Sequence, residues 1–222
     1  MLNRLSLAAV VGLAVASVAL AADTPGIAVD KAAKTVTVDA KVSPRKVLDS
    51  GEIYPIEVVA CWGKEKKGKK AHETIVTIDV RPSDVAKALE SLGAKPGKPA
   101  VGDEAKAAGP VVNVFIQMAP ADGGKKLSID KVLVDPKTNK PMPKVKFHFT
   151  GSAPSKVPGQ PDVPFGADTT GSLIMLFPVD AETVFQSAFT MKEEKYLKLD
   201  VKQGALPKEG TPVKLVLELA GK

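Results

Sequence analysis

The chain has 222 residues, of which 44% are hydrophobic and 25% are charged, a composition typical of a folded globular protein and not of a disordered one. Its formal net charge is +6, but lysine supplies nearly all of the excess and aromatic residues make up only 5%. Nucleic-acid-binding proteins rely on arginine forks and stacking aromatics, so this composition argues against a nucleic-acid partner.

The first 21 residues have the pattern of a cleavable secretory signal peptide. Arg4 precedes the uncharged, apolar run Leu5–Leu20, and Ala19 and Ala21 provide the small residues before a cleavage expected at Ala22. An uncleaved N-terminal anchor is the less favoured alternative, because the run is shorter than the ~20 residues that a spanning helix needs. No later apolar stretch is long enough to cross a bilayer. We therefore expect an exported protein, periplasmic or extracellular, without stable membrane insertion after cleavage.

The first part of the mature chain has the patterning of β-strands. Alternating apolar residues over 27–42 predict a hairpin whose turn lies at 30–34. The segments 51–62 and 74–80 predict two more strands, joined by a lysine-rich connector at 63–70. We expect these two strands to pair as an antiparallel hairpin with the lysines at its solvated tip.

One helix is predicted directly after the 74–80 strand. Pro82 opens it, Ser83 is the expected N-cap, and Asp84 complements the helix dipole in the first turn. Apolar residues recur at helical spacing on one face, and Gly93 is placed to end the helix. The residues of that face are Val85, Leu89 and Leu92.

The rest of the chain adds further short strands separated by proline- and glycine-rich segments. Strands are predicted over 111–118, 127–134, 145–150, 173–177 and 213–219, with a surface loop at 96–110 and a helical turn within 180–187. This order predicts an α+β, mainly β fold of antiparallel, sandwich-like sheets with one or two short helices packed on them. We expect one domain over residues 22–222.

Several segments resemble the YdjY-domain family. The most specific is HETIVTIDVRPSDVAKALESLGAKPG (72–97), and GEIYPIEVVACWGKEKKGKKA (51–71) fits the segment before it. Weaker matches are FHFTGS (147–152), GADTTGSLIMLFPVDAETVF (166–185) and GTPVKLVLEL (210–219). The resemblance implies one exported domain of a family without an assigned activity. A ferredoxin-like label given to some members does not suit a chain with one cysteine, which cannot bind a cluster.

His72 and Glu73 are the first candidates for catalysis, because histidine transfers protons near neutral pH and a carboxylate lies next to it. Neighbours on a strand point to opposite faces, so we favour a structural role for both. The HExxH zinc motif is absent, since the sequence continues Thr74-Ile75-Val76.

Cys61 is the other candidate, because a hairpin closing over 63–70 would place it opposite His72, and a cysteine–histidine pair can form a thiolate nucleophile. A lone cysteine in an apolar strand is more often a small buried hydrophobe, which is the interpretation that we favour. As the only cysteine it excludes an internal disulfide and cysteine-based metal sites.

Three weaker signals remain. His148 alternates with two phenylalanines, and its convergence with His72 on a metal is not indicated by spacing. The segments 150–152 and 169–172 are tight turns or the lining of a polar cleft. The lysines of 64–70 are a solvated surface or, less favoured, a contact for polyanions.

Three functional hypotheses follow. The favoured one is a non-enzymatic binding or accessory module of the cell envelope with an unknown envelope or protein ligand. The alternatives are an enzyme that uses Cys61 and His72, and a structural envelope protein. No cofactor and no metal are expected.

Overall fold

The structure is a computed structural model that describes residues 24–46, 51–68, 70–155 and 163–221. The expected signal peptide, residues 1–21, lies outside the described residues. None of the helices in these ranges combines the length and the apolar character needed to cross a membrane.

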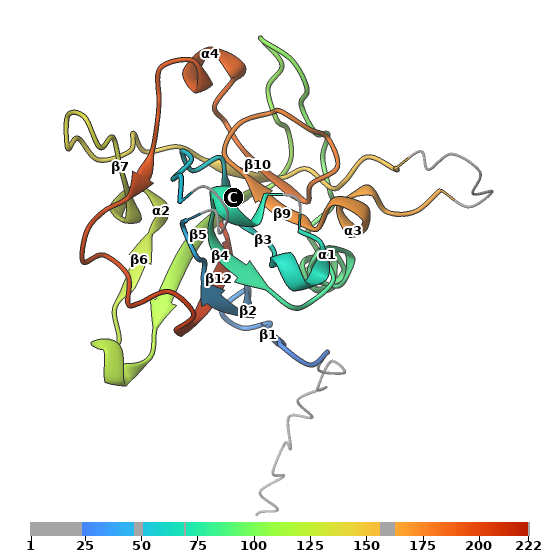
Figure 1. Ribbon diagram of the computed structural model, residues 1–222. Coiled ribbons are helices and arrows are strands. Elements are labelled where there is room, and N and C mark those ends of the chain that lie inside the picture. The colour runs from blue at the N-terminus through green and yellow to red at the C-terminus, as the bar shows by residue number, and fades with distance from the viewer. Residues whose placement is uncertain (1–23, 47–50, 69, 156–162, 222) are drawn as a thin grey trace, which may run out of the picture.

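Within the described residues, eight strands close into a ring (Figure 1). β4 pairs back onto β2, with Ala40 opposite Ile78, and this pairing closes the barrel. The β3–β4 and β9–β10 pairs are parallel and the other pairs of the ring are antiparallel. The prediction of antiparallel, sandwich-like sheets is therefore wrong, although the chain is mainly β. The ring runs β2 (Thr35–Val42), β12 (Pro212–Leu219), β5 (Val111–Met118), β8 (Phe147–Phe149), β10 (Phe185–Ser187), β9 (Ser172–Met175), β3 (Val58–Trp62) and β4 (Thr74–Ile78).

The lysine-rich connector between β3 and β4 is the reason why the sheet is not antiparallel as predicted. β3 and β4 lie parallel, from Val58 opposite Thr74 to Trp62 opposite Ile78, so the chain after Trp62 must return along the barrel before β4 starts. Residues 63–68 and 70–73 belong to this crossover and include two 3-10 turns, η1 (Lys64–Lys66) and η2 (Ala71–Glu73). The predicted antiparallel hairpin with a lysine tip is wrong, because alternation identifies strands but not their direction.

Other strand predictions vary in outcome. The hairpin over 27–42 is confirmed as β1 (Ile27–Asp30) paired with β2. The predicted 127–134 strand is instead β6 (Lys126–Ser128), the helical turn α2 (Ile129–Val132) and β7 (Leu133–Val134), which pairs with β11 (Asp200–Val201). The predicted helical turn within 180–187 is wrong, since β10 occupies its second half.

Helix α1 (Pro82–Ser91) confirms the predicted helix, but its cap differs. Arg81 is the N-cap residue, and Ser83 lies inside the first turn. The acceptor for the Ser83 N–H is the carboxylate of Asp168, at 2.9 Å, from α3 (Gly166–Thr170). Figure 1 shows α1 and α3 side by side, in contact, while α4 (Met191–Glu194) lies at the far end of the molecule from β1. The expected Ser83 cap is therefore replaced by a cap from a distant segment.

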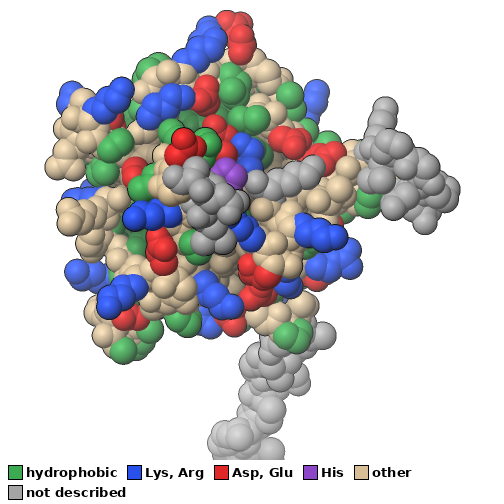
Figure 2. All heavy atoms as spheres, viewed as in Figure 1, with side chains coloured by type: hydrophobic (Ala, Val, Ile, Leu, Met, Phe, Trp, Pro, Cys, Tyr) green, Lys and Arg blue, Asp and Glu red, His purple; other side chains and the backbone are tan. Residues whose placement is uncertain are grey.

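One continuous hydrophobic cluster fills the barrel and includes residues from both sides of the 96–110 loop, from Ile27 to Leu217. Val58, Cys61 and Met175 form a separate small cluster. The loop is fastened to the barrel by Gln186, whose fully buried amide accepts from the Ala100 N–H at 2.7 Å and donates to the Ala100 carbonyl at 2.9 Å. On the face shown in Figure 2, lysine and arginine side chains are interspersed with aspartate and glutamate.

Candidate functional site

His72 and Glu73 lie together at the end of the crossover. They belong to the 3-10 turn η2 and not to a strand, so the expectation that they point to opposite faces is wrong. His72 Nε2 lies 3.2 Å from Glu73 Oε1, and Lys70 Nζ lies 2.9 Å from Glu73 Oε2. Lys70 also pairs with Glu57. Three charged groups thus join the crossover to the segment that leads into β3.

Arg45, which was not among the candidate residues predicted from the sequence, is the centre of this arrangement. Its Nη1 donates to the His72 carbonyl at 2.6 Å, its Nη2 donates to the Tyr54 carbonyl, and Nη2 and Asp200 Oδ1 are 3.1 Å apart. The Arg45 side chain is only 12% exposed. One composition signal pointed to it: Arg45 and Arg81 are the only arginines after Arg4 in a lysine-rich chain. Both make forked contacts with a carboxylate, for which arginine is better suited than lysine.

We call Arg45, Glu57, Lys70, His72, Glu73 and Asp200 the polar cluster. Burial of Lys70 works against its charged form, but hydrogen bonds from its ammonium to Glu57 and Glu73 outweigh burial and raise the Lys70 pKa. A lysine held charged in this way is neither a nucleophile nor a base. The Tyr54 ring packs edge-on to His72 with 5.2 Å between centroids. The cluster is therefore a brace between chain segments.

Cys61 is buried, with 1% of its surface exposed. Burial raises the pKa of its thiol to about 12, well above the usual thiol range. Its strand neighbours are Thr77 in β4 and Ser172 in β9, because β3 and β4 run parallel, so the expected placement opposite His72 is wrong. A buried, protonated thiol is not a nucleophile at neutral pH.

His148 lies on β8, and its ring Nδ1 is 3.0 Å from the Gly109 carbonyl oxygen. Phe147 and Phe149 on either side are buried, which confirms the predicted alternation. β8 pairs with β5 and β10, whereas His72 precedes β4 elsewhere on the ring. No group of three histidine, cysteine or carboxylate residues that could hold a metal ion occurs in the described parts of the chain.

Neither threonine- and glycine-rich segment is the tight turn that was expected: 169–172 spans the end of α3, its C-cap Gly171 and the start of β9, and 150–152 is irregular backbone after β8. Gly171 has a φ of +75°, and a Cβ there would lie 2.8 Å from the Trp62 ring. Thr150 Oγ1 donates to the Val184 carbonyl at 3.0 Å. The 150–152 segment also lines a hollow of about 340 Å³ with Glu90 and Lys98. Of the two interpretations of that segment, turn and cleft lining, the lining of a cleft therefore applies.

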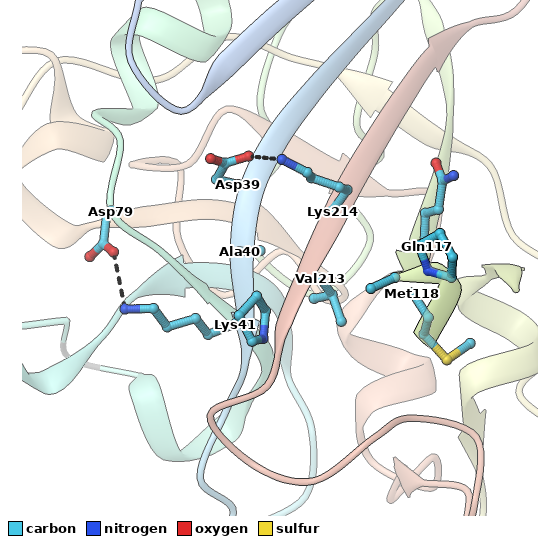
Figure 3. Close-up of a pocket in the computed structure, with 11 residues that line it drawn as sticks. Asp39, Ala40, Lys41, Asp79, Gln117, Met118, Val213 and Lys214 are labelled. Atoms are coloured by element: carbon cyan, nitrogen blue, oxygen red, sulfur yellow. Dashed lines mark hydrogen bonds and ion pairs between the residues drawn. The ribbon is translucent and has the colours of Figure 1, made fainter. Parts of the chain in front are cut away.

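A groove of about 530 Å³ lies over β2, β12 and the end of β5 (Figure 3). Its rims contain two ion pairs, Lys41–Asp79 at 3.6 Å and Lys214–Asp39 at 2.5 Å, whose four side chains are all more than half exposed. Among the described residues that line it, none is histidine, cysteine, serine or threonine. Those residues are Asp39, Ala40, Lys41, Asp79, Gln117, Met118, Ala119, Pro120, Pro212, Val213 and Lys214.

The register of β2, β12 and β5 explains why some of the residues that line the groove are exposed and others are buried. Asp39, Lys214 and Gln117 lie in one row across the three strands, and all are exposed. Ala40, Val213 and Met118 form the next row, and all are buried. Pro120, in the turn after β5, walls one side with Ala119. The exposed apolar surface of the groove therefore comes from Ala119, Pro120 and Pro212 and lies between charged rims, a combination that suits binding.

Comparison with known proteins gives one finding. The model of the YdjY domain matches residues 27–218, which is nearly all of the described chain. Neither the curated proteins nor the solved structures contain a match to the chain.

Proposed function

The chain belongs to the YdjY-domain family, and from that premise we propose that it is an exported, non-enzymatic binding module of the cell envelope that holds a segment of a partner protein in the groove. The signal-peptide pattern of residues 1–21 supports export. The groove supports binding. Its exposed ion pairs rearrange readily, since exposed pairs contribute only about 0–1 kcal/mol each.

The observation that carries the proposal is the separation between the groove and the reactive side chains. The groove is lined by apolar and paired charged residues. The candidate nucleophile Cys61 is buried elsewhere with a pKa of about 12, and His72 is engaged by Glu73 and Tyr54. An enzyme built on Cys61 and His72 needs a thiolate within reach of the imidazole, and the register of β3 and β4 works against it.

Substitution inside the groove tests the proposal. Gln117→Trp places a large ring in the groove from an exposed position of β5. Asn113→Trp is the matched control, because Asn113 is exposed on the same face of β5 but does not line the groove. We expect both variants to fold with similar stability. A partner crosslinked to the native protein in the exported fraction is lost with Gln117→Trp and kept with Asn113→Trp. Equal capture by both variants would refute groove binding.

Export is tested separately with the full chain. We expect a mature protein in the exported fraction that begins at Ala22 by N-terminal mass analysis. Deletion of residues 2–21 retains the protein in the cytoplasm. A full-length chain recovered with the membrane fraction would instead support the anchor alternative.

A further inference from the structure

The groove adjoins a group of lysines from two different segments. Lys41 lines the groove and pairs with the Asp79 carboxylate, while Lys66 of the crossover donates to the Asp79 backbone carbonyl. The crossover therefore brings its lysines to one end of the groove. We call Lys41, Lys46, Lys64 and Lys66 the lysine patch; all four are exposed.

A second, smaller hollow lies beside the groove. It has a volume of about 130 Å³ and is lined by Lys46 and Lys64 together with Pro44, Ala71 and Thr77, among others. Thr77 in β4 is the register partner of Lys41 in β2, which lines the groove, so the two hollows meet in one row of the sheet on neighbouring strands. An extended segment that enters the groove reaches the hollow by crossing from β2 to β4.

Charge is unevenly distributed along this path. Asp79 is paired with Lys41, and the Glu65 carboxylate lies back against Gly63, where it leaves no room for a side chain. At the other end of the groove, Lys214 and Asp39 balance one another. Among the described residues that line the groove and the hollow, Asp79 and Glu65 are the carboxylates beside the patch, so the patch end is positive and the far end is neutral.

We propose that the segment held by the groove is acidic, with an apolar side chain in the groove and carboxylates on the lysine patch. This inference rests on the proposed function and names the chemistry of its partner. Charge complementarity with the patch selects carboxylates. The exposed apolar surface of the groove, formed by Ala119, Pro120 and Pro212, favours a peptide over a purely anionic polymer, which has nothing to bury there.

The probe is a synthetic peptide of four Glu-Leu repeats, measured by fluorescence anisotropy against the folded mature protein. Its comparison probes are the same peptide with Gln in place of Glu, polyglutamate, and inorganic polyphosphate. We expect the Glu-Leu peptide to bind most tightly, with affinity that falls as salt rises. The combined variant Lys41→Gln/Lys64→Gln/Lys66→Gln weakens this binding about 10- to 100-fold, since three charge contacts are lost.

The control variant Lys137→Gln/Lys140→Gln/Lys202→Gln removes the same charge from exposed positions outside the groove and patch, and we expect it to bind as the native protein does. Equal weakening by both triple variants would show a non-specific charge effect and overturn the proposal. Polyphosphate or polyglutamate binding as tightly as the Glu-Leu peptide would overturn it in favour of a polyanion. If no acidic probe binds while Gln117→Trp still abolishes partner capture, the acidic class fails and the groove function stands.

Discussion

Asp168 accepts hydrogen bonds from both the backbone N–H and the hydroxyl of Ser83, at 2.9 and 2.7 Å, so a residue 85 positions later caps helix α1. The same carboxylate is contacted by the Arg81 guanidinium at 2.7 Å. These contacts raise the pKa of Arg81, first through the hydrogen bond and then through the charge of Asp168. The Asp168 side chain is 8% exposed, whereas that of Arg81 is 67% exposed. The cap is therefore a nearly buried tertiary contact.

Removing this cap is expected to destabilise the protein. Asp168→Ala leaves the Ser83 N–H and hydroxyl without their acceptor and lowers the free energy of unfolding by about 2 kcal/mol. Urea unfolding followed by circular dichroism measures the change. The matched control is Asp84→Ala, which removes an acid from the same helix turn and costs less than about 1 kcal/mol. Equal losses in the two variants would show that Asp168 contributes no more than helix-dipole electrostatics.

Because the Trp62 ring lies close to Gly171, we expect a larger side chain at this position to lower the stability of the protein. Gly171→Ala places a Cβ 2.8 Å from the Trp62 ring at a φ of +75°. Gly93→Ala is the control, because its φ is +86° but nothing lies within 4 Å of the added Cβ. The control loses about 1 kcal/mol of stability to backbone strain alone, and Gly171→Ala loses about 1–3 kcal/mol more because it overpacks. Chemical denaturation gives both values, and the tryptophan emission changes only for Gly171→Ala. Identical losses would contradict the close packing on Trp62.

The buried thiol predicts a dependence of stability on alkaline pH. Burial raises the Cys61 pKa from 9.0 to about 12, so between these values the unfolded thiol is ionised while the folded thiol keeps its proton. The contribution of Cys61 to stability is therefore fully present below pH 9 and is lost as pH rises toward 12. From pH 9 to pH 11 the native protein loses about 2 kcal/mol more than Cys61→Ala does.

Urea unfolding of both proteins at the two pH values checks this difference. Subtracting the variant removes the contribution of the lysines, which titrate in the same range. A parallel measurement at pH 8 is alkylation with iodoacetamide, which we expect to be slow in the native state and rapid after unfolding. Rapid native-state alkylation would show that the thiol is neither buried nor protonated.

From the contacts of Arg45 we predict that a positive charge alone at position 45 does not preserve the polar cluster. Arg45→Lys keeps the positive charge but cannot reach Asp200 and the carbonyls of Tyr54 and His72 together. We expect a loss of about 2 kcal/mol in the free energy of unfolding, measured by urea denaturation. Lys46→Gln, at an exposed neighbouring position, changes stability by less than about 0.5 kcal/mol. An Arg45→Lys variant as stable as the native protein would show that a single charge is sufficient.

The local sequence pattern was sufficient to predict several strands and one helix. The alternation in 27–42, 111–118 and 213–219 predicted β1–β2, β5 and β12, and proline, helical spacing and glycine predicted α1. These signals are local, because each depends on residues within one strand or one helix turn.

The direction of each strand and the strand with which it pairs could not be predicted from local patterns. Residues 63–73 look like a charged hairpin tip, and only the ring closure through Ala40 and Ile78 shows that they are a crossover. The mistaken placement of Cys61 opposite His72 followed from that one error. The cap of α1 by Asp168 and the assembly of the cluster around Arg45 are likewise long-range contacts, which no short window of sequence contains.

The closure of the barrel also constrains when the protein can fold. β12, the last strand of the described residues, lies between β2 and β5 and pairs with both along nearly its whole length. The sheet therefore stays open between β2 and β5 until β12 has paired. Closing contacts between positions so far apart in sequence is slow, because the entropy of the long loop is lost first. For the export that we propose, this delay is an advantage, because a chain whose barrel has not yet closed can still cross a membrane unfolded.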